Sequence, residues 1–284
     1  MLGWLHDAAS GITWAQVQNT RMQLTFVSHY GPKPAPFAEK IRLLQSVIAE
    51  QLGSRFKPYT VEQVHGTIIG FEGARFGTRI RNDNFRRFRG AERFIDFQGV
   101  LDFLRTRPES NWDVRVGGYE SARDYGFTSA GQHPFLRSFS VPGEIAVAMG
   151  WPHCSGSFVP SLDELRRAFQ QFGALHKWHQ CESDVDNDFF FVLGRVAQNT
   201  ESAQRDAVQQ IIREHLAAAP LQLPVTRATL SFVAYLDPQL PPDTSQTFHL
   251  NDQQVTASLL AAIYDDDASG LSDGPRSYPG LRST

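Results

Sequence analysis

The hydrophobic pattern in the first quarter of the chain changes period twice. Apolar and β-branched residues alternate over residues 22–30 and 61–71, which predicts two β-strands. Between them, over residues 37–52, apolar residues recur at three- and four-residue spacing, which predicts a helix with one buried stripe. The predicted order is strand, helix, strand.

The last quarter repeats this outline. Residues 189–196 are predicted to form a strand, 203–216 a helix and 226–236 a second strand. An internal repeat of strand, helix and strand favours two pseudo-symmetric lobes whose equivalent strands lie side by side over a shared cleft.

The middle of the chain is less regular. Residues 74–131 are interpreted as an insertion that contains a short helix at 97–104. We expect residues 1–264 to form one bilobal domain. Residues 265–284, rich in Asp, Ser, Gly and Pro, are predicted to be a disordered tail.

Two further elements follow the middle segment. Residues 135–140 and 144–149 flank a turn dipeptide and predict a hairpin. A helix is predicted over residues 162–176, with Ser161 as its N-cap and Glu164 completing a capping box.

Composition narrows the class of protein. A formal net charge of −3 provides no global positive field, so DNA is not an expected partner and any nucleotide must be recognised locally. The two cysteines, Cys154 and Cys181, are too few for a disulfide framework and fit a reducing compartment. With no secretory signal and no apolar run long enough to span a membrane, we expect a soluble cytoplasmic protein.

Two short motifs occupy equivalent places in the repeat. In Val64-His65-Gly66-Thr67-Ile68, strand geometry places His65 and Thr67 on one face, and Thr226-Arg227-Ala228-Thr229-Leu230 does the same for Arg227 and Thr229. The pattern of histidine, any residue, threonine and an apolar residue on two related strands resembles the signature of the 2H phosphoesterase superfamily. The resemblance covers roughly residues 20–73 and 186–237.

The resemblance implies an α+β fold with antiparallel sheets around a central cleft. It also implies a substrate with a 2′,3′-cyclic phosphate or a 2′,5′ linkage. His65 is then a general acid or base, because an imidazole exchanges protons near neutral pH, and Thr67 and Thr229 bind phosphate. Arg227 departs from the pattern, since it replaces the second histidine. Its guanidinium can bind phosphate but cannot accept a proton.

Several side chains are candidates for the missing proton-transfer partner. His133, in a stretch of small residues able to form a loop over the cleft, ranks above His29 and Tyr125. Tyr119 and Tyr125 are candidates for stacking on a base. Arg75 opens an arginine-rich stretch that is interpreted either as a phosphate-binding lid or as a surface segment with its phenylalanines packed inward.

Metal binding is not predicted. Histidines and cysteines at 153, 154, 176, 179 and 181 are zinc-binding types, but their spacing matches no zinc motif. His176 and His179 are interpreted as exposed or helix-terminal. Aspartates 184, 186 and 188 lack the glycine and glutamate of a calcium loop and are expected to keep the start of the next strand soluble.

These observations lead to three hypotheses. The first is a metal-independent phosphoesterase, without cofactor, acting on a cyclic or 2′,5′-linked nucleotide or an RNA end. The second is a sensor or sponge that holds such a ligand in the same groove without turnover. The third is a structural protein that retains the fold alone. Sequence leaves the natural substrate and the oligomeric state open.

Overall fold

The computed structural model describes residues 21–108 and 112–265. In these ranges the chain forms seven α-helices and two β-sheets. The helices are α2 (Ala35–Leu52), α3 (Asp83–Arg89), α4 (Phe97–Thr106), α5 (Pro134–Arg137), α6 (Ser161–Ala168), α7 (Ser202–Ala218) and α8 (Ala257–Ala262). 3-10 turns include η3 (Phe169–Phe172), η4 (Arg227–Thr229) and η5 (Ile263–Asp265).

The main sheet has eleven strands, all paired antiparallel. Its path is β11 (Leu221–Pro224), β6 (Asp113–Val116), β8 (Ile145–Cys154), β10 (Phe189–Val196), β3 (Gly66–Gly70), β1 (Gln23–Ser28), β12 (Leu230–Tyr235) and β13 (Gln246–His249). Short strands β2 (Phe56–Pro58), β7 (Phe139–Ser140) and β9 (Ser157–Phe158) pair with β10 and β8. Strands β4 (Gly73–Phe76) and β5 (Arg79–Asn82) form a separate hairpin. The antiparallel α+β class is as expected.

The sheet has two halves that meet where β3 and β10 touch. The registered pair there is Gly66 with Phe191. A Cβ on Gly66 would overlap the ring of buried Phe189, so glycine is required for this close approach. The same glycine separates the two polar residues of the first motif, His65 and Thr67.

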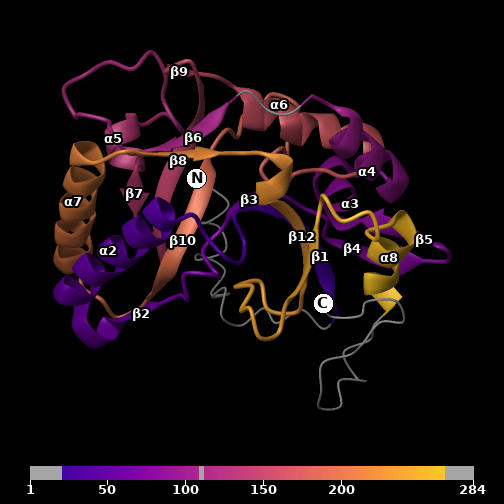
Figure 1. Cartoon of the computed structure of the whole chain (residues 1–284), viewed down its shortest axis with the longest axis horizontal. Helices are drawn as coiled ribbons and strands as arrows, with labels where there is room; N and C mark the ends of the chain where they lie inside the picture. The colour runs from indigo at the N-terminus through magenta and orange to yellow at the C-terminus, as the bar shows by residue number, and fades with distance from the viewer. Residues whose placement is uncertain (1–20, 109–111, 266–284) are drawn as a thin grey trace.

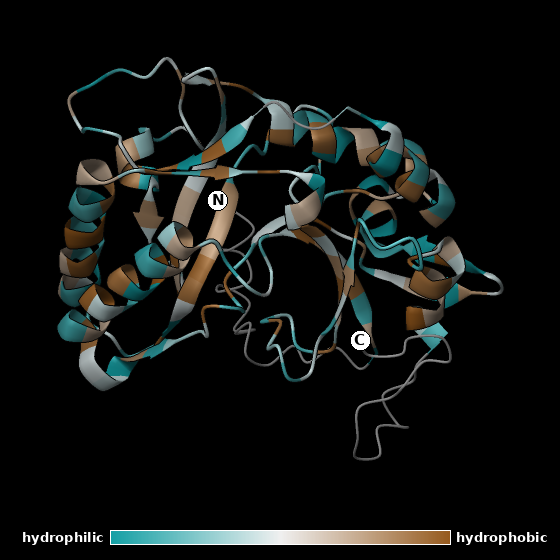
Figure 2. Cartoon of the chain, in the orientation of Figure 1, coloured by the Kyte–Doolittle hydropathy of each residue, from teal (hydrophilic) through white to brown (hydrophobic). Residues whose placement is uncertain are grey.

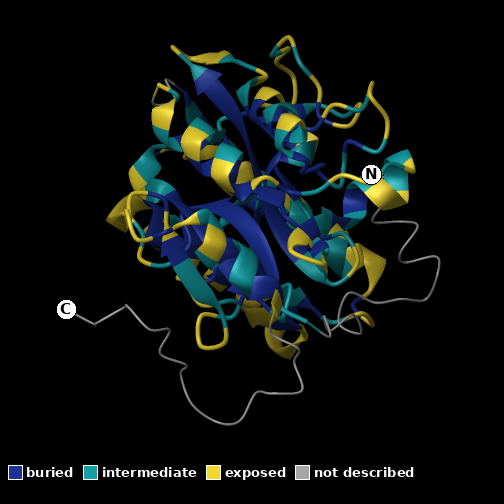
Figure 3. Cartoon of the chain, turned by 90° about the vertical axis from the view of Figure 1, so that its right-hand side faces the viewer, coloured by how far each residue is buried: buried dark blue, intermediate teal, exposed yellow. Residues whose placement is uncertain are grey.

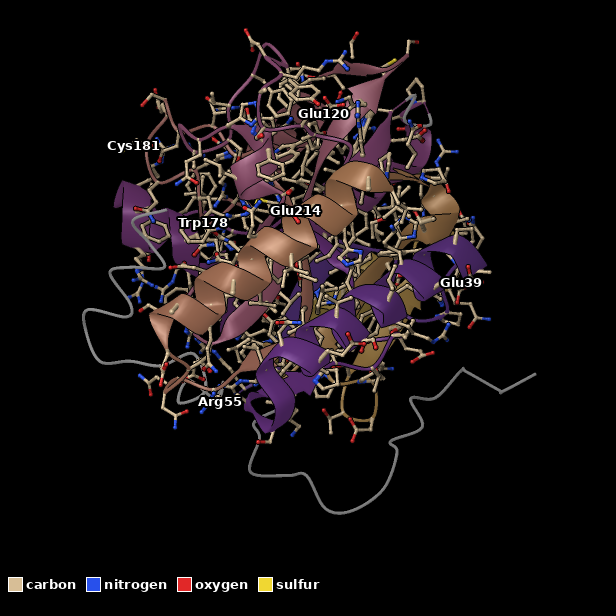
Figure 4. The ribbon with its side chains drawn as sticks, turned by 90° about the vertical axis from the view of Figure 1, so that its left-hand side faces the viewer. Glu39, Arg55, Glu120, Trp178, Cys181 and Glu214 are labelled. Atoms are coloured by element: carbon tan, nitrogen blue, oxygen red, sulfur yellow. The ribbon has the colours of Figure 1, made fainter. Side chains whose placement is uncertain are left out.

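Different helices cover the two halves. Helices α2 and α7 lie side by side against the half that contains β8 and β10 (Figures 1 and 4). In this layer Phe37 packs on Phe191 at 5.3 Å between ring centroids, and Gln45 Nε2 donates to Leu193 O at 2.9 Å. Helix α2 follows strand β1 in the chain, yet it packs on α7, β2, β10 and β11.

The other half, with β1, β3 and β12, is covered by α4, α6 and η3. Phe26 on β1 contacts Phe169 and Phe232 at 6.1 and 4.7 Å between centroids. In both halves the helices carry hydrophobic and hydrophilic residues in alternating bands, and the strands β8 and β10 are mostly hydrophobic (Figure 2). Figure 3 shows the buried strands passing between helices that are exposed on their outer faces.

Most predicted elements are present. The predicted strand, helix and strand of the first quarter are present as β1, α2 and β3. The strand and helix predicted at residues 189–196 and 203–216 are present as β10 and α7. The middle segment is more than an insertion, because β6 lies inside the main sheet between β11 and β8. Its Val114 and Val116 are buried.

Several local predictions are wrong. Helix α6 begins at Ser161 with Pro160 as N-cap and no side-chain cap, so the capping box of Ser161 and Glu164 does not form. The helix ends at Ala168 and continues as η3 rather than reaching residue 176. Residues 134–137 are helix α5, which leaves only β7 to pair with β8 in the predicted hairpin.

The last predicted strand also begins later than expected. Residues 227–229 form η4, because Thr226 and Thr229 hydrogen-bond each other's side chains and backbone in place of a strand partner. The strand itself starts at Leu230. Arg227 and Thr229 are therefore not side chains on one face of a strand.

No helix in residues 21–108 and 112–265 is long and apolar enough to cross a membrane. Of the predicted tail, Asp265 is the last residue of η5, and residues 266–284 lie outside the described residues.

Candidate functional site

A cavity of about 620 Å³ is the main candidate site. Its wall combines both halves of the sheet: the start of β3, the middle of β10 and the segment leading into β8. The rest comes from α6, residues 176–178, the start of α7 and the β12–β13 connection. This volume is typical of sites for nucleotide-sized ligands.

His65 lies on this wall, one residue before β3. Its Nδ1 is 2.6 Å from the carbonyl oxygen of Gln63. Since a carbonyl oxygen can only accept, Nδ1 carries the proton, and the Nε2 lone pair is left available when the ring is neutral. The edge of the ring packs against Tyr30, with 5.6 Å between centroids.

Burial keeps this imidazole neutral at physiological pH. Burial lowers the pKa of His65 to about 4; the Gln63 hydrogen bond opposes the shift, and the charge of Lys33 adds to it. The pKa of Lys33 is itself lowered to about 7 by burial. At neutral pH His65 is therefore uncharged and able to accept a proton.

Thr67 lies on the same wall. It follows His65 by two positions in the chain, and both residues line the cavity at the start of β3. The backbone carbonyl of Thr67 accepts from Arg166 Nη2 at 2.9 Å, and this hydrogen bond connects β3 to α6. The first predicted motif thus forms one polar edge of the cavity.

The wall carries an excess of positive charge. Among the described residues that line it, Glu144 is the one carboxylate, against Arg166, Lys177, Arg195 and Arg205. Arg195 forms an ion pair with Glu144. Within the described part of the chain, Arg205 donates to carbonyl oxygens alone, those of residues 143, 197, 198 and 200. Its charge is therefore not neutralised by a carboxylate, which favours an anionic ligand.

Aromatic side chains complete the wall. Tyr59, Trp178 and Phe190 all line the cavity, and Trp178 is labelled in Figure 4. Rings next to cationic groups are the combination that holds a base and a phosphate together.

The structure does not bring the second predicted motif to this cavity. Arg227 lines a separate pocket of about 20 Å³, together with Arg107. Its Nη2 donates to the carbonyl oxygen of Arg107, and burial together with the charge of Arg227 lowers the pKa of Arg107. Thr229 Oγ1 accepts from Thr226 N at 3.1 Å and contacts Ser28 Oγ at 3.2 Å.

The candidate partners of His65 also lie elsewhere. His133 is the N-cap of α5, and its ring nitrogens contact Arg123 O at 2.7 Å and Phe135 N at 3.2 Å. His29 is buried against Phe37, where burial lowers its pKa to about 4. Neither histidine is among the residues that line the cavity.

The predicted base-stacking and phosphate-binding residues are engaged in the fold. Tyr119 is 1% exposed and packs on Trp151 at 5.2 Å between ring centroids. Tyr125 packs edge-on against Tyr119, and its hydroxyl accepts from Glu120 N at 2.8 Å. Arg75 forms an ion pair with Asp265 beside the β4–β5 hairpin. None of the three is on the cavity wall.

Sequence reasoning missed a buried ionic network behind the cavity. His176 and His179, expected to be exposed or helix-terminal, are 2% and 0% exposed and lie beyond the end of η3 at Phe172. His176 Nε2 lies 2.8 Å from Asp186 Oδ2, and His179 Nε2 lies 2.9 Å from Asp163 Oδ1. Of these four residues, His176 lines the cavity.

The aspartates before β10 are likewise structural rather than solubilising. Asp188 accepts from Trp151 Nε1 at 2.6 Å and from Arg137 Nη2 at 2.8 Å. Asp186 pairs with buried Arg166 at 3.0 Å. The signal in the sequence is the alternation of Asp at 184, 186 and 188 shortly after two histidines. Across residues 21–108 and 112–265, no group of three or more metal-ligating side chains converges.

Comparison with known proteins gives little guidance. No protein-family model matches the chain. No curated protein matches it. Among solved structures it is similar to TT0787 of Thermus thermophilus, at 11% identity over 82% of this chain and 100% of that chain, with a TM-score of 0.37. A similarity this low supports no conclusion about fold or function.

Proposed function

We propose that the protein is a metal-independent phosphoesterase that binds a cyclic or 2′,5′-linked nucleotide, or an RNA end, in this cavity. One observation carries the proposal: His65 and Thr67 share the wall of a nucleotide-sized cavity with an excess of cationic side chains. The motif that resembles the 2H phosphoesterases supports the same interpretation at His65 and Thr67, and not at Arg227 and Thr229.

The chemistry follows from the state of each side chain. His65 is neutral and offers Nε2, so it can take a proton from the attacking water. The Thr67 hydroxyl can donate to a phosphate oxygen. Arg205 and the other cationic side chains of the wall stabilise negative charge that develops on the phosphate.

A second candidate is a binding protein without turnover. The observation in its favour is the position of Arg227 and Thr229 outside the cavity. If no other group supplies the second proton transfer, the site holds its ligand without cleaving it.

The test is hydrolysis of 2′,3′-cyclic, 3′,5′-cyclic and 2′,5′-linked nucleotides, with binding measured in parallel by calorimetry. We expect His65→Asn to lower kcat on the order of 10²- to 10⁴-fold. His249→Asn, at an exposed histidine that does not line the cavity, is the matched control and retains activity. Binding with no turnover would favour the second candidate, and the absence of both would refute both candidates.

Two further variants locate the phosphate. Thr67→Val is compared with Thr25→Val, since Thr25 is a buried threonine on the adjacent strand whose hydroxyl donates to Ile69 O, away from the cavity wall. We expect Thr67→Val to weaken nucleotide binding and Thr25→Val to leave it unchanged. If Arg227→Met lost as much hydrolytic activity as His65→Asn, the result would contradict the proposal. It would place the phosphate at the small pocket that Arg227 lines.

A further inference from the structure

A second, smaller sheet lies outside the cavity wall. Strands β4 and β5 pair as a hairpin, which projects from the body of the molecule at the right of Figure 1. Residues 93–95 run along β5, where Arg81 bridges to Phe94 and Ile95 N donates to Ile80 O at 2.8 Å. Three adjacent antiparallel segments therefore form a surface with two faces.

One face is packed against the protein and the other is open. Ile80 and Ile95 are 2% and 8% exposed, and Arg75, which lies opposite Ile80, forms an ion pair with Asp265. Side chains alternate between the faces along a strand, and directly paired residues share a face. The open side, here called the arginine–phenylalanine face, therefore carries Phe76, Arg79, Arg81 and Phe94.

The rings and guanidinium groups of this face stack on one another. The guanidinium carbon of Arg79 lies 3.7 Å from the ring centroid of Phe94, and that of Arg81 lies 5.4 Å from the ring centroid of Phe76. Phe76 is nevertheless 57% exposed, and no other aromatic side chain in residues 21–108 and 112–265 is as exposed. Part of its ring is thus open to a ligand.

The region carries positive charge that the described residues do not neutralise. Arg75, Arg81 and Arg89 form ion pairs with carboxylates. Four exposed arginines have neither an ion pair nor a side-chain hydrogen bond with any described residue: Arg79, Arg86, Arg87 and Arg93. All four lie within residues 79–93, which gives a local positive field on a chain whose net charge is −3.

A single strand of nucleic acid has the chemistry that complements this face. Each base has a flat apolar surface that stacks on an aromatic ring, and each phosphate is an anion. A guanidinium that stacks on a ring still has its N–H edge for phosphate oxygens. Bases in a duplex are already stacked on each other, and a membrane-surface site has a broad apolar face, whereas only one ring is exposed here.

We propose that the arginine–phenylalanine face binds a single strand of nucleic acid. One base stacks on Phe76, while Arg79 and the exposed arginines of α3, Arg86 and Arg87, bind phosphates. The proposal goes beyond the proposed function, because binding at this face does not require turnover in the cavity.

Helix α3 connects this face to the cavity wall. It begins at Asp83, directly after β5, and ends at Arg89, whose Nη2 donates to His179 O at 3.0 Å. Residues 176–178, which immediately precede His179, line the cavity. A strand bound along α3 leads towards the cavity, which favours an RNA end over a free nucleotide as its substrate; this consequence alone rests on the proposed function.

The experiment measures binding of a fluorescein-labelled single-stranded RNA of about 12 nucleotides by fluorescence anisotropy at several salt concentrations. For the wild type we expect a Kd on the order of 10⁻⁶ to 10⁻⁴ M that rises with salt. Phe76→Ala removes stacking alone, so Kd should rise about 10-fold with the same salt dependence. Arg79→Gln should also raise Kd, and it should reduce the slope of log K against log salt by about 0.7, the effect of one lost phosphate contact.

Two variants outside the face are matched controls. Arg123 is exposed and stacks on Tyr125 at 5.3 Å from its ring centroid, and Leu136 is 45% exposed. Arg123→Gln and Leu136→Ala should bind RNA as the wild type does. His65→Asn should also bind RNA within a few-fold of the wild type, which separates this proposal from catalysis in the cavity.

Several outcomes would overturn the proposal. It would be refuted by the absence of RNA binding, or by equal losses in the face variants and their controls. Equal affinity for an RNA duplex of the same length would refute stacking on a base. Binding to vesicles that contain phosphatidylserine, without binding to RNA, would identify the face as a membrane site instead.

The link to the cavity has its own test. If the substrate is an RNA end, Phe76→Ala should raise KM for a short RNA with a 2′,3′-cyclic phosphate and leave KM for the mononucleotide unchanged. An unchanged KM for both, or tighter binding of single-stranded DNA of the same sequence, would refute the link and leave the binding surface intact. Absence of turnover on every substrate would refute the proposed function alone.

Discussion

At the scale of single residues, burial decides whether a histidine is charged. His65 and His176 lie on the cavity wall and His29 lies in the core, and burial is the largest cause of the lowered pKa in each. At neutral pH each of these imidazoles is therefore uncharged, and His65 has a lone pair that can accept a proton. The free energy of unfolding is lowered at low pH, because the unfolded chain then binds more protons at these histidines than the folded chain does.

His29 allows this cost to be measured away from the cavity. Its folded pKa is about 4 and its unfolded value is 6.5, so the unfolded chain binds more protons between these values. Stability is therefore lost as the pH falls from 6.5 towards 4. His29 has a φ of 60°, a left-handed conformation that asparagine also adopts, which makes His29→Asn a conservative test.

We expect wild type to lose about 2–3 kcal/mol more than His29→Asn between neutral pH and about pH 4.5. Urea denaturation at both pH values measures the difference. Equal losses in the two proteins would show that His29 is not held neutral in the folded state.

At the scale of elements, hydrophobic periodicity predicted most strands and helices, and local polar contacts set their ends. The pattern predicts a strand from residue 226, but the hydroxyls of Thr226 and Thr229 satisfy each other's backbone and delay it to Leu230. Arg227 lies in η4 and lines the small pocket, whereas His65 and Thr67 line the cavity. A strand pattern contains no information on such competition.

The junction of β3 and β10 is the element contact most sensitive to substitution. Alanine at Gly66 would bring a methyl group into the ring of Phe189, which is fully buried and stacks on Phe191 at 5.7 Å between centroids. We expect Gly66→Ala to lower the free energy of unfolding by about 1–3 kcal/mol, the usual cost of overpacking a core. Urea denaturation is the measurement, and an unchanged midpoint would show that Phe189 can move.

At the scale of the whole molecule, the two halves of the sheet share one core. The main cluster of buried side chains includes Phe232 and Leu24 from one half and Ala146 and Leu193 from the other. The contact of β10 with β3 and the bonds from Arg166 cross between them. The cavity lies where the halves meet, so its shape depends on both.

A shared core predicts that the halves unfold together. In native-state hydrogen exchange we expect the amides of β8 and β12, one strand from each half, to report the same opening free energy within about 1 kcal/mol. A difference of several kcal/mol would mean that the halves are independent units. The cavity would then have a variable shape.

The sequence by itself determined the α+β class and most element positions, and it places His65 and Thr67 two residues apart, because these depend on periodicity and on neighbours along the chain. Only the tertiary structure decided which distant side chains share the cavity. His176 and Arg205 are far from His65 in sequence, and the tautomer of His176 depends on its hydrogen bond to Asp186. Desolvation and ion pairing are properties of the packed molecule, and a linear pattern does not encode them.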